Sequence, residues 1–476
     1  MSKNRIRFYN TLTRQLEDFK PLNEDLVSLY SCGPTVYSTP HIGNMRAYTF
    51  VDLLVRTLKV NGYNVKNLIN ITDVGHLTSD ADDGDDKLEK AAKQKQKNAY
   101  DIAEEYTNIF FRYLEELNIT KPSKFPKATE HIKEQIEMIS ILEDKGYTYI
   151  TKDGVYFNTA KFDKYSELSK LDIEGLRKGE RVDFGDKVNS TDFALWKFSP
   201  QNEQRDMEWE SPWGKGFPGW HIECSAMACK HLGEQIDIHT GGIDHIPIHH
   251  TNEIAQTESV TDKKFVNYWL HVNFLQLLSD ENTNSDKDSE LKMSKSKGTA
   301  YTIDQLIEMG FNPLSLKYFY LSAHYRNELK FNFNILKNQE HAFNKLRNKI
   351  YDLREKTSFY DYKKNNLVLN MLSLLNEDLD TPKMLAYFHE EINNNDNTNE
   401  DKLSLVYYFD LLTGLELLNY QPTQVLIPEN VIQLAEDRLI ARKNKDWAVS
   451  DELRELIKSE GFEIKDSKDS YELNKI

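Results

Sequence analysis

The chain has little of what stabilises secreted or membrane proteins. Three cysteines in 476 residues are too few for a disulfide scaffold, which favours a reducing compartment. Apolar stretches are short: Leu26–Tyr30 is broken by Ser28 and falls well short of the roughly 20 residues that cross a bilayer. The first residues run into mixed polar sequence without the apolar segment of a signal peptide. We therefore expect a globular, cytoplasmic protein without a membrane segment.

Positive charge is also scarce overall. Lys and Arg number 60 against 76 Asp and Glu, and the net charge of −16 argues weakly against a polyanionic partner. Locally the balance reverses, because residues 326–356 hold eight basic and four acidic side chains, a local +4. The segment Lys87–Lys97 adds five lysines against Glu89. The simplest interpretation of either run is a solvated helix face.

Length and periodicity indicate an α/β protein of about three domains, at roughly 150 residues each. Val27–Ser31 and Asn64–Asn70 are typical of short strands. Between them, apolar side chains in residues 51–58 recur at i, i+3, i+4 and i+7, which predicts a helix after Pro40 with Asn44 as a cap near its start. Strand, helix and strand form the βαβ unit of a parallel, nucleotide-type sheet.

Beyond this unit the pattern changes twice. Helices are predicted at Tyr100–Leu117 and from Ile132 to about Gly146, followed by a hairpin around Asp153-Gly154. A β-containing insertion therefore begins near residue 123 and interrupts the parallel sheet. From Leu336 onward the pattern is almost wholly helical, with a polar loop at Glu390–Asp401.

Histidine is concentrated in one short segment. Residues 221–250 hold six of the 13 histidines and two of the three cysteines, namely His221, His231, His239, His245, His249, His250, Cys224 and Cys229. One buried histidine is ordinary core packing, but this clustering predicts a metal or catalytic site.

Spacing within that cluster suggests ligands. On a helix, His249 and Glu253 lie one turn apart on one face, within reach of a common cation. A thiolate from elsewhere would suit a borderline-soft ion such as zinc. From spacing alone, Cys224 and Cys229 could equally supply a chelating pair. Spacing therefore does not decide which cysteines would provide the sulfur ligands.

Three short segments could bind a nucleotide. Lys292–Ser296, followed by Gly298, is either a basic surface loop or a loop that wraps a polyphosphate with charge and hydroxyl groups. His41–Asn44 enters a helix where an anion would meet free N–H groups. Gly241–Asp244 offers close backbone approach and a carboxylate for a nucleoside sugar, although it is also an ordinary turn. The acidic stretch Asp80–Asp86 does not match an EF-hand and is interpreted as an exposed turn.

In this order, the segments resemble the class I aminoacyl-tRNA synthetases, and within them the cysteinyl-tRNA synthetase family of bacterial type. The resemblance covers nearly the whole chain, and several matches together are very rare by chance. It is carried by Phe8–Arg14, Cys32–Tyr37, His41–Asn44, Asn70–Asp73, Asp192–Lys197, Gly219–Met227, His249–Gln256, Lys292–Ser296, Asp378–Pro382 and Lys445–Ala448.

The resemblance implies a fold and its domains. The fold is α/β, with a Rossmann-like parallel-sheet catalytic domain, a β-containing insertion, a C-terminal helical bundle and a small anticodon-binding domain. The implied boundaries are 1–122 with 217–276 for the catalytic domain, 123–216 for the connective insertion, 277–330 for a stem-contact region with the Lys292–Ser296 loop, 331–421 for the bundle and 422–476 for the anticodon-binding domain.

The resemblance also implies an activity. A member of this family is a ligase that activates L-cysteine with ATP and Mg²⁺ to cysteinyl-adenylate and pyrophosphate, then transfers cysteine to tRNA(Cys). One Zn²⁺ per chain selects the cysteine thiolate over serine, and no separate editing site is needed. A cytoplasmic monomer is expected.

Residue roles follow from the matched motifs only. The implied zinc ligands are Cys32, Cys224, His249 and Glu253, which leaves Cys229 as ordinary packing. The implied cysteine-binding residues are Gly33, Thr35, Thr72 and Trp220. The implied ATP-binding residues are His41, Asn44, Gly241, Gly242, Asp244 and Lys295, and the implied catalytic residues are His41, Lys292 and Lys295.

The sequence departs from the family's pattern in four places. Asn44 replaces the second histidine of the first signature, Thr240 replaces a glycine of the Gly-rich stretch, and Thr251 replaces the acid after the tandem histidines. The loop before Lys292 is extended. None of these positions is an implied zinc ligand.

Two other functions compete with this one. A homologous ligase joins cysteine to an amino sugar in mycothiol synthesis and shares the catalytic domain, but it lacks a full anticodon-binding region. The residues that follow Leu336 here favour RNA as acceptor, and the local +4 at 326–356 suits an RNA backbone. A zinc hydrolase or non-catalytic zinc module would not need the Lys292–Ser296 loop.

Overall fold

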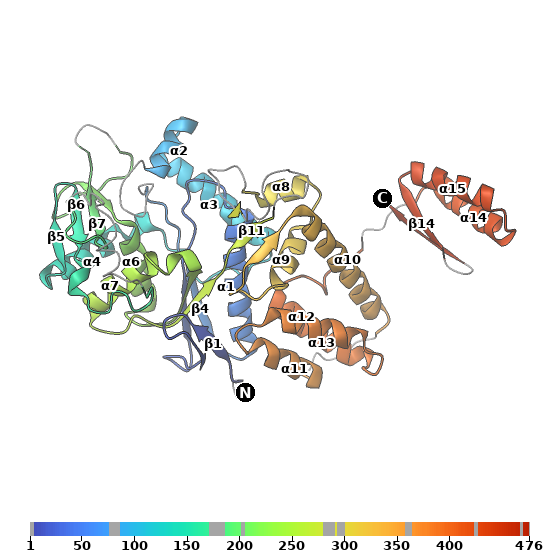
Figure 1. Ribbon diagram of the computed structural model, residues 1–476, viewed down its shortest axis with the longest axis horizontal. Helices are drawn as coiled ribbons and strands as arrows, with labels where there is room; N and C mark the ends of the chain where they lie inside the picture. Colours follow the sequence, from blue (N-terminus) through green and yellow to red (C-terminus); the bar gives the residue numbers. More distant parts are fainter. Residues whose placement is uncertain are drawn as a thin grey trace. The chain divides into compact units, whose positions relative to one another are not determined.

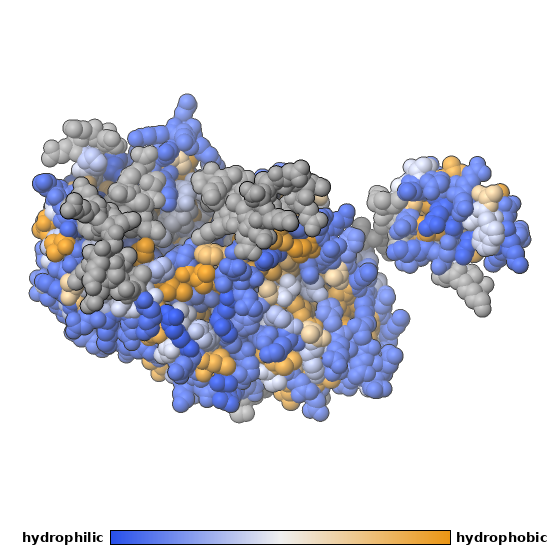
Figure 2. Space-filling view, viewed as in Figure 1, coloured by the Kyte–Doolittle hydropathy of each residue, from blue (hydrophilic) through white to orange (hydrophobic). Residues whose placement is uncertain are grey.

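The protein divides into two compact units, residues 1–419 and 420–476. The computed structural model describes residues 4–75, 86–170, 186–200, 205–278, 291–292, 300–357, 364–422, 427–466 and 470–475. Within these ranges, no helix is long and apolar enough to cross a membrane. The face of the molecule in Figure 2 is mostly hydrophilic, with small apolar patches between charged side chains.

A four-stranded parallel sheet lies at the centre of the first unit and confirms the predicted α/β fold. Its strands, in spatial order, are β10 (Val266–Val272), β9 (Ile236–Gly242), β3 (Val27–Ser31) and β4 (Val65–Ile69). The helix α1 (Ile42–Val60) connects β3 to β4, as the periodicity predicts. Leu29, Ile238 and Leu270 on neighbouring strands are fully buried, as expected of a sheet covered on both faces.

The start of α1 differs from the prediction. The N-cap is His41, not Asn44: the Nδ1 of His41 accepts from the backbone N–H of Asn44 at 3.2 Å. In return, the Asn44 side-chain oxygen accepts from the His41 backbone N–H at 3.1 Å. Both residues therefore lie at the N-terminus of a 19-residue helix, where the dipole and free N–H groups favour an anion.

A second sheet is formed by residues between 148 and 218 (Figure 1), so it extends slightly past the insertion expected at 123–216. It is antiparallel and contains β5 (Thr148–Ile150), β6 (Gly154–Phe157), β7 (Phe193–Phe198) and β8 (Gly216–Pro218). The β5–β6 pair confirms the predicted hairpin. The helices α4 (Ile132–Asp144) and α6 (Trp220–Leu232) pack on this sheet, and α7 (His249–Thr261) packs on both helices. The helices α2 (Lys87–Lys95) and α3 (Ala99–Glu116) pack against each other, and short 3-10 turns lie at Ala128–His131, Thr159–Lys161 and Ile243–His245.

Small strands and helices complete the first unit. The strands β1 (Arg7–Asn10) and β2 (Gln15–Asp18) pair with each other, and β11 (Leu275–Leu277) lies between β12 (Leu291–Lys292) and β13 (Leu329–Phe331). The helices are α8 (Ile303–Glu308), α9 (Pro313–Leu321), α10 (Phe333–Glu355), α11 (Asn366–Leu375), α12 (Thr381–Asn393) and α13 (Asn399–Thr413). The polar loop between α12 and α13 is shorter than predicted, because α12 continues to Asn393 and α13 begins at Asn399.

From Leu336 onward the chain is mostly helical, as predicted, but the second unit also contains a hairpin that the pattern did not indicate. The helices α14 (Glu429–Lys443) and α15 (Trp447–Ser459) pack against a hairpin of β14 (Phe462–Asp466) and β15 (Tyr471–Lys475). Phe462 and Ile464 alternate with exposed residues and join the buried cluster with Ile457. Buried Arg438 is tied to the hairpin through the carboxylate of Asp466.

A buried ion pair anchors α1 to the helices that follow. Lys317 on α9 lies 2.8 Å from Asp52 on α1, and both side chains are 1% exposed. Lys317 also donates to the Asn118 carbonyl at 2.9 Å, and Arg56 donates to the same carbonyl and to Asp52. The Asp52 carboxylate accepts from the Thr120 backbone as well, so the buried charges are compensated.

Removal of the lysine should therefore destabilise the first unit. We expect Lys317→Met to lower the free energy of unfolding by about 3 kcal/mol, because Asp52 stays buried with one of its two cationic partners gone. Urea denaturation followed by circular dichroism measures this. Lys133→Met is the control, because Lys133 is 83% exposed and its pair with Glu137 should contribute little. Equal transition midpoints for the two variants would contradict the role of the pair.

Candidate functional site

A cavity of about 700 Å³ opens at the carboxyl edge of the parallel sheet. Each strand contributes a residue at or just beyond its end: Cys32 follows β3, Thr72 lies beyond β4, Gly241 lies at the end of β9 and Asn273 follows β10. Ligands of open parallel sheets bind at this edge, because the loops that leave adjacent strands there enclose a crevice. The cavity is therefore the candidate active site.

The structure brings most of the predicted substrate-binding residues to this cavity. Those that line it are Gly33, Thr35, His41, Asn44, Thr72, Trp220, Gly241, Gly242 and Asp244. Two cations to which the sequence assigned no site role, Lys87 and Lys197, also line it. Lys292 is placed by its backbone, at the end of β12 and opposite Gln276 of β11. Lys295 and the rest of the loop to Ser296 lie outside the described residues.

At two positions on the cavity wall, neighbouring atoms lie so close to the backbone that only glycine fits. The Gly33 N–H donates to the Asn70 side chain at 2.8 Å, and a Cβ at Gly33 would lie 1.5 Å from the Asn70 carbonyl oxygen. A Cβ at Gly241 would lie 2.6 Å from the His250 ring and 2.7 Å from the His245 ring. Any side chain at these positions would displace the base of the cavity, so glycine is needed there.

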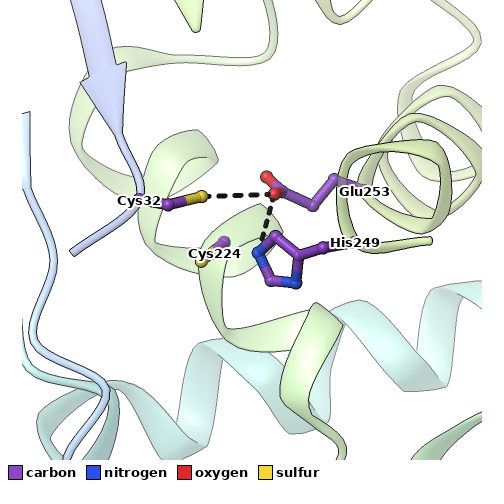
Figure 3. A group of neighbouring side chains, drawn as sticks. All are labelled: Cys32, Cys224, His249 and Glu253. Carbon is purple, nitrogen blue, oxygen red and sulfur yellow. Dashed lines mark hydrogen bonds and ion pairs between the residues drawn. The ribbon is translucent and has the colours of Figure 1, made fainter. Parts of the chain in front are cut away.

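At the base of the cavity four side chains converge. Figure 3 shows Cys32 just after β3, Cys224 on α6, and His249 and Glu253 on α7, all directed toward one point. One donor atom from each of the four lies within 4.8 Å of the others. His249 Nε2 and Glu253 Oε1 are 3.0 Å apart, as their one-turn spacing predicts, and Cys32 Sγ is 3.9 Å from the same oxygen.

This donor set suits zinc. Two sulfurs, one imidazole and one carboxylate are the donors that Zn²⁺ takes in proteins. All but Cys32 are buried. Cys229 does not belong to the group; it is half-buried and packs among apolar residues of the insertion. Geometry therefore favours Cys32 as the second sulfur donor over the alternative pair of Cys224 and Cys229.

Other histidines fix the orientation of the donors. His221 Nδ1 lies 2.9 Å from His249 Nδ1, so the Nε2 of His249 is directed toward the group. His239 Nε2 lies 2.9 Å from the outer oxygen of Glu253, and the His239 ring stacks on Trp269 with centroids 4.6 Å apart. Such outer contacts hold ligands in place before a metal binds.

A chain of hydrogen bonds also ends on Cys32. His250 Nε2 lies 3.2 Å from Cys32 Sγ, His250 Nδ1 lies 2.8 Å from His271 Nε2, and His271 Nδ1 lies 2.8 Å from the Thr11 hydroxyl. Burial raises the pKa of Cys32, so without a metal it is a thiol; as a metal-bound thiolate it would only accept, and His250 would then donate to it. His271 then donates to His250, and Thr11 to His271. Every link has one donor and one acceptor with both rings neutral.

A second set of donors overlaps the first. Cys32, His239, His250 and Glu253 also lie within 4.8 Å of one another. Neither His239 nor His250 lines the cavity, whereas Cys224 and His249 do. A ligand in the cavity therefore reaches Cys32, Cys224 and His249 of the first set, with Glu253 buried behind them, and we assign the outer histidines to orientation.

Interactions within the first donor set shift the pKa values of Cys224, His249 and Glu253. The hydrogen bond with Cys32 lowers the pKa of Cys224 to about 6, although burial opposes this shift. Burial lowers the pKa of His249, but the charges of Glu253 and Cys224 outweigh it and raise the pKa to about 10. Burial also opposes ionisation of Glu253, yet His239 and His249 hold its pKa below the ordinary range. An anionic thiolate and carboxylate are the donor forms that a cation requires.

Some of these residues were beyond sequence reasoning. The histidine cluster indicated a site but did not distinguish direct donors from the orienting residues His221, His239 and His250. His271 carried no signal. Thr11 and Lys197 lie in matched segments, Phe8–Arg14 and Asp192–Lys197, but no role was assigned to them, because their roles depend on which elements lie side by side.

Comparison with known proteins agrees with this site. The model of the tRNA synthetases class I (C) catalytic domain matches residues 18–341. Cysteine--tRNA ligase 1 of Burkholderia lata is 44% identical over 98% of this chain and 96% of its own length. Cysteine--tRNA ligase of Zymomonas mobilis is 41% identical over 97% of this chain and 96% of its own length. That of Treponema denticola is 38% identical over 97% of this chain and 98% of its own length.

A solved structure supports the fold at lower similarity. The methionyl-tRNA synthetase of Mycobacterium tuberculosis, in complex with methionyl-adenylate, superposes with a TM-score of 0.57 over 84% of this chain and 95% of that one. At 13% identity this likeness concerns the fold alone. The matched catalytic-domain model and the near full-length relatives settle the family: the chain belongs to the class I tRNA synthetases, in the cysteine--tRNA ligase family.

Proposed function

We propose that this protein activates L-cysteine with ATP and transfers it to tRNA(Cys), as an ATP-dependent cysteine--tRNA ligase. The observation that carries the proposal is the donor set of Cys32, Cys224, His249 and Glu253 at the base of the nucleotide-type cavity. ATP would bind with Mg²⁺, and the enzyme would work as a monomer in the cytoplasm.

The donor set would hold one Zn²⁺ and thereby select the amino acid. Serine differs from cysteine by one atom of similar size, so a pocket wall could discriminate only weakly. Bound zinc would take the substrate sulfur as a thiolate, whereas a hydroxyl stays protonated and is a poor ligand. Trp220 would cover the substrate, since its ring lies 4.7 Å from that of His249. Thr72 and Gly33 would hold its polar end from the opposite wall.

Residues on other walls would bind ATP. His41 and Asn44 place the N-terminus of α1 at the cavity, where it would meet the phosphates. Gly241, Gly242 and Asp244 would contact the adenosine. Lys292 and Lys295 would neutralise charge as the cysteine carboxylate attacks the α-phosphate and pyrophosphate leaves. Such a reaction depends on positioning and charge stabilisation rather than on a covalent nucleophile.

One assay tests the function directly. Purified protein should catalyse cysteine-dependent exchange of pyrophosphate into ATP and should charge a tRNA(Cys) transcript with cysteine but not with serine. Exchange without tRNA charging, together with cysteine transfer to an amino sugar, would favour the small-amine ligase. Absence of exchange in zinc-replete protein would remove the proposed function.

The zinc ligands can be tested with two matched cysteine variants. Cys224→Ser should lose bound zinc and raise the KM for cysteine, because a serine hydroxyl is a poor zinc donor. Cys229→Ser should keep one zinc per chain and near-normal exchange, because Cys229 lies outside the donor group. Metal analysis by mass spectrometry and exchange kinetics measure both. One zinc per chain in Cys224→Ser would show that the ligand assignment is wrong.

The two half-reactions should separate on truncation. The donor set and the cavity lie in the first unit, whereas RNA recognition requires contacts far from the chemistry. A chain that ends at Asn419 should retain part of the cysteine-dependent exchange and lose most tRNA charging. Circular dichroism is the control that the first unit is still folded. Full charging by the folded truncation would exclude residues 420–476 as an RNA-binding element.

A further inference from the structure

One buried arginine lies between the two segments assigned to ATP. Arg46 is in the second turn of α1 and is 3% exposed. Within the described part of the chain it forms no ion pair with a carboxylate. Burial lowers its pKa to about 10, so it stays charged at neutral pH. An unpaired buried charge is costly and persists only where hydrogen bonds compensate it.

Four backbone carbonyls supply that compensation. Nη1 of Arg46 donates to the carbonyls of Asn273 at 2.8 Å and Phe274 at 2.6 Å. Nη2 donates to the carbonyls of Asn327 at 2.7 Å and His324 at 3.3 Å. The first two acceptors lie just after β10, and the other two lie just after α9. One guanidinium therefore ties two separate loops to α1.

Both loops lead into the small sheet that carries Lys292. Asn273 and Phe274 line the cavity and run directly into β11, which pairs with β12 so that Gln276 lies opposite Lys292. The other loop leads into β13, which pairs with β11 on its other side. The Leu329 N–H donates to the Phe274 carbonyl at 3.0 Å and closes the two loops on each other. Arg46 thus binds both loops that lead into this sheet, one before β11 and one before β13.

The helix that carries Arg46 also carries the other phosphate-binding segment. His41 and Asn44 lie within one and a half turns of it, at the start of α1. Lys292 begins the loop that continues to Ser296. The guanidinium therefore connects α1 to the loops that lead into β11 and β13, and the Ile42 N–H makes a second connection by donating to the Tyr301 carbonyl at 2.8 Å.

We propose that Arg46 is a positioning residue that sets the distance between the His41–Asn44 segment and β12, which ends at Lys292, during cysteine activation. The inference rests on the proposed function and goes beyond it by assigning a role to a residue that touches neither substrate. The planar fork of arginine reaches carbonyls in two loops at once, whereas the single nitrogen of lysine cannot span both. Loss of the fork lets the two segments shift, and a shift of about 1 Å can cost about a hundredfold in rate.

The test compares two identical substitutions on one helix. Arg46→Lys keeps the charge but loses the fork. Arg56→Lys is the matched control, because Arg56 also donates to backbone carbonyls and lies on α1, but its partners Asp52, Asn118 and Leu411 are not cavity residues. Both variants should lose some stability. Only Arg46→Lys should lose kcat for cysteine-dependent pyrophosphate exchange, by about tenfold to a hundredfold, with zinc content and the KM for cysteine unchanged.

A second readout does not depend on activity. Hydrogen exchange measured by mass spectrometry should accelerate in residues 273–278 and 291–292 of Arg46→Lys, and stay at the wild-type rate there in Arg56→Lys. A kcat within twofold of wild type, or equal losses of kcat in the two variants, would overturn the proposal. So would failure of Arg46→Lys to fold, because the four bonds would then act on the whole fold. If wild-type protein shows no exchange activity, the proposed function fails, and the hydrogen-exchange result still decides whether Arg46 orders these strands.

Discussion

The carboxyl edge of the parallel sheet is the constraint on which the rest of this molecule depends. Four strands that run in one direction must release their chains at the same edge, so residues far apart in the sequence are brought together there. Cys32 follows β3, Gly241 ends β9, and α7 begins shortly after β9 with His249. The donor group at the base of the cavity is thus a consequence of strand direction, and its chemistry comes from the side chains placed there.

Two kinds of hydrogen-bond network compensate polar groups buried near that edge, although a few atoms there, such as His239 Nδ1, have no partner among the described residues. Around the donor group, neutral histidines pass hydrogen bonds from Thr11 through His271 and His250 to Cys32. Around α1, cations donate to backbone carbonyls instead, as Arg46 does to four of them. Satisfied networks of this kind hold one geometry, because any displacement leaves a buried polar group without a partner. A rigid base and a rigid wall are what a reaction governed by positioning needs.

Sequence reasoning reached the elements that depend on local patterns. The strand Val27–Ser31 and the helix after Pro40 follow from hydrophobic periodicity, and the one-turn pair of His249 and Glu253 follows from helix geometry. The partnership of Cys32 with Cys224 came only from the resemblance, because no local pattern relates residues on different elements. The cap of α1 was misplaced because His41, an uncommon N-cap, takes the position that asparagine usually holds. The hairpin β14–β15 was missed although Phe462 and Ile464 alternate, because two short strands are a weak signal beside long helices.

The fold does not choose the amino acid. A methionyl-tRNA synthetase shares this architecture at 13% identity, so proteins named for different amino acids have this fold. What separates these amino acids must lie in the few side chains at the base of the cavity. Here that base holds two thiols, one imidazole and one carboxylate, with Glu253 and His249 oriented from behind by His239 and His221. A hydrophobic pocket would discriminate by side-chain size, and serine and cysteine are nearly equal in size. A bound metal would discriminate by the acidity of the side-chain S–H or O–H group, in which the two amino acids differ greatly. With zinc bound as proposed, selection by acidity would make a distinction that shape alone could not make.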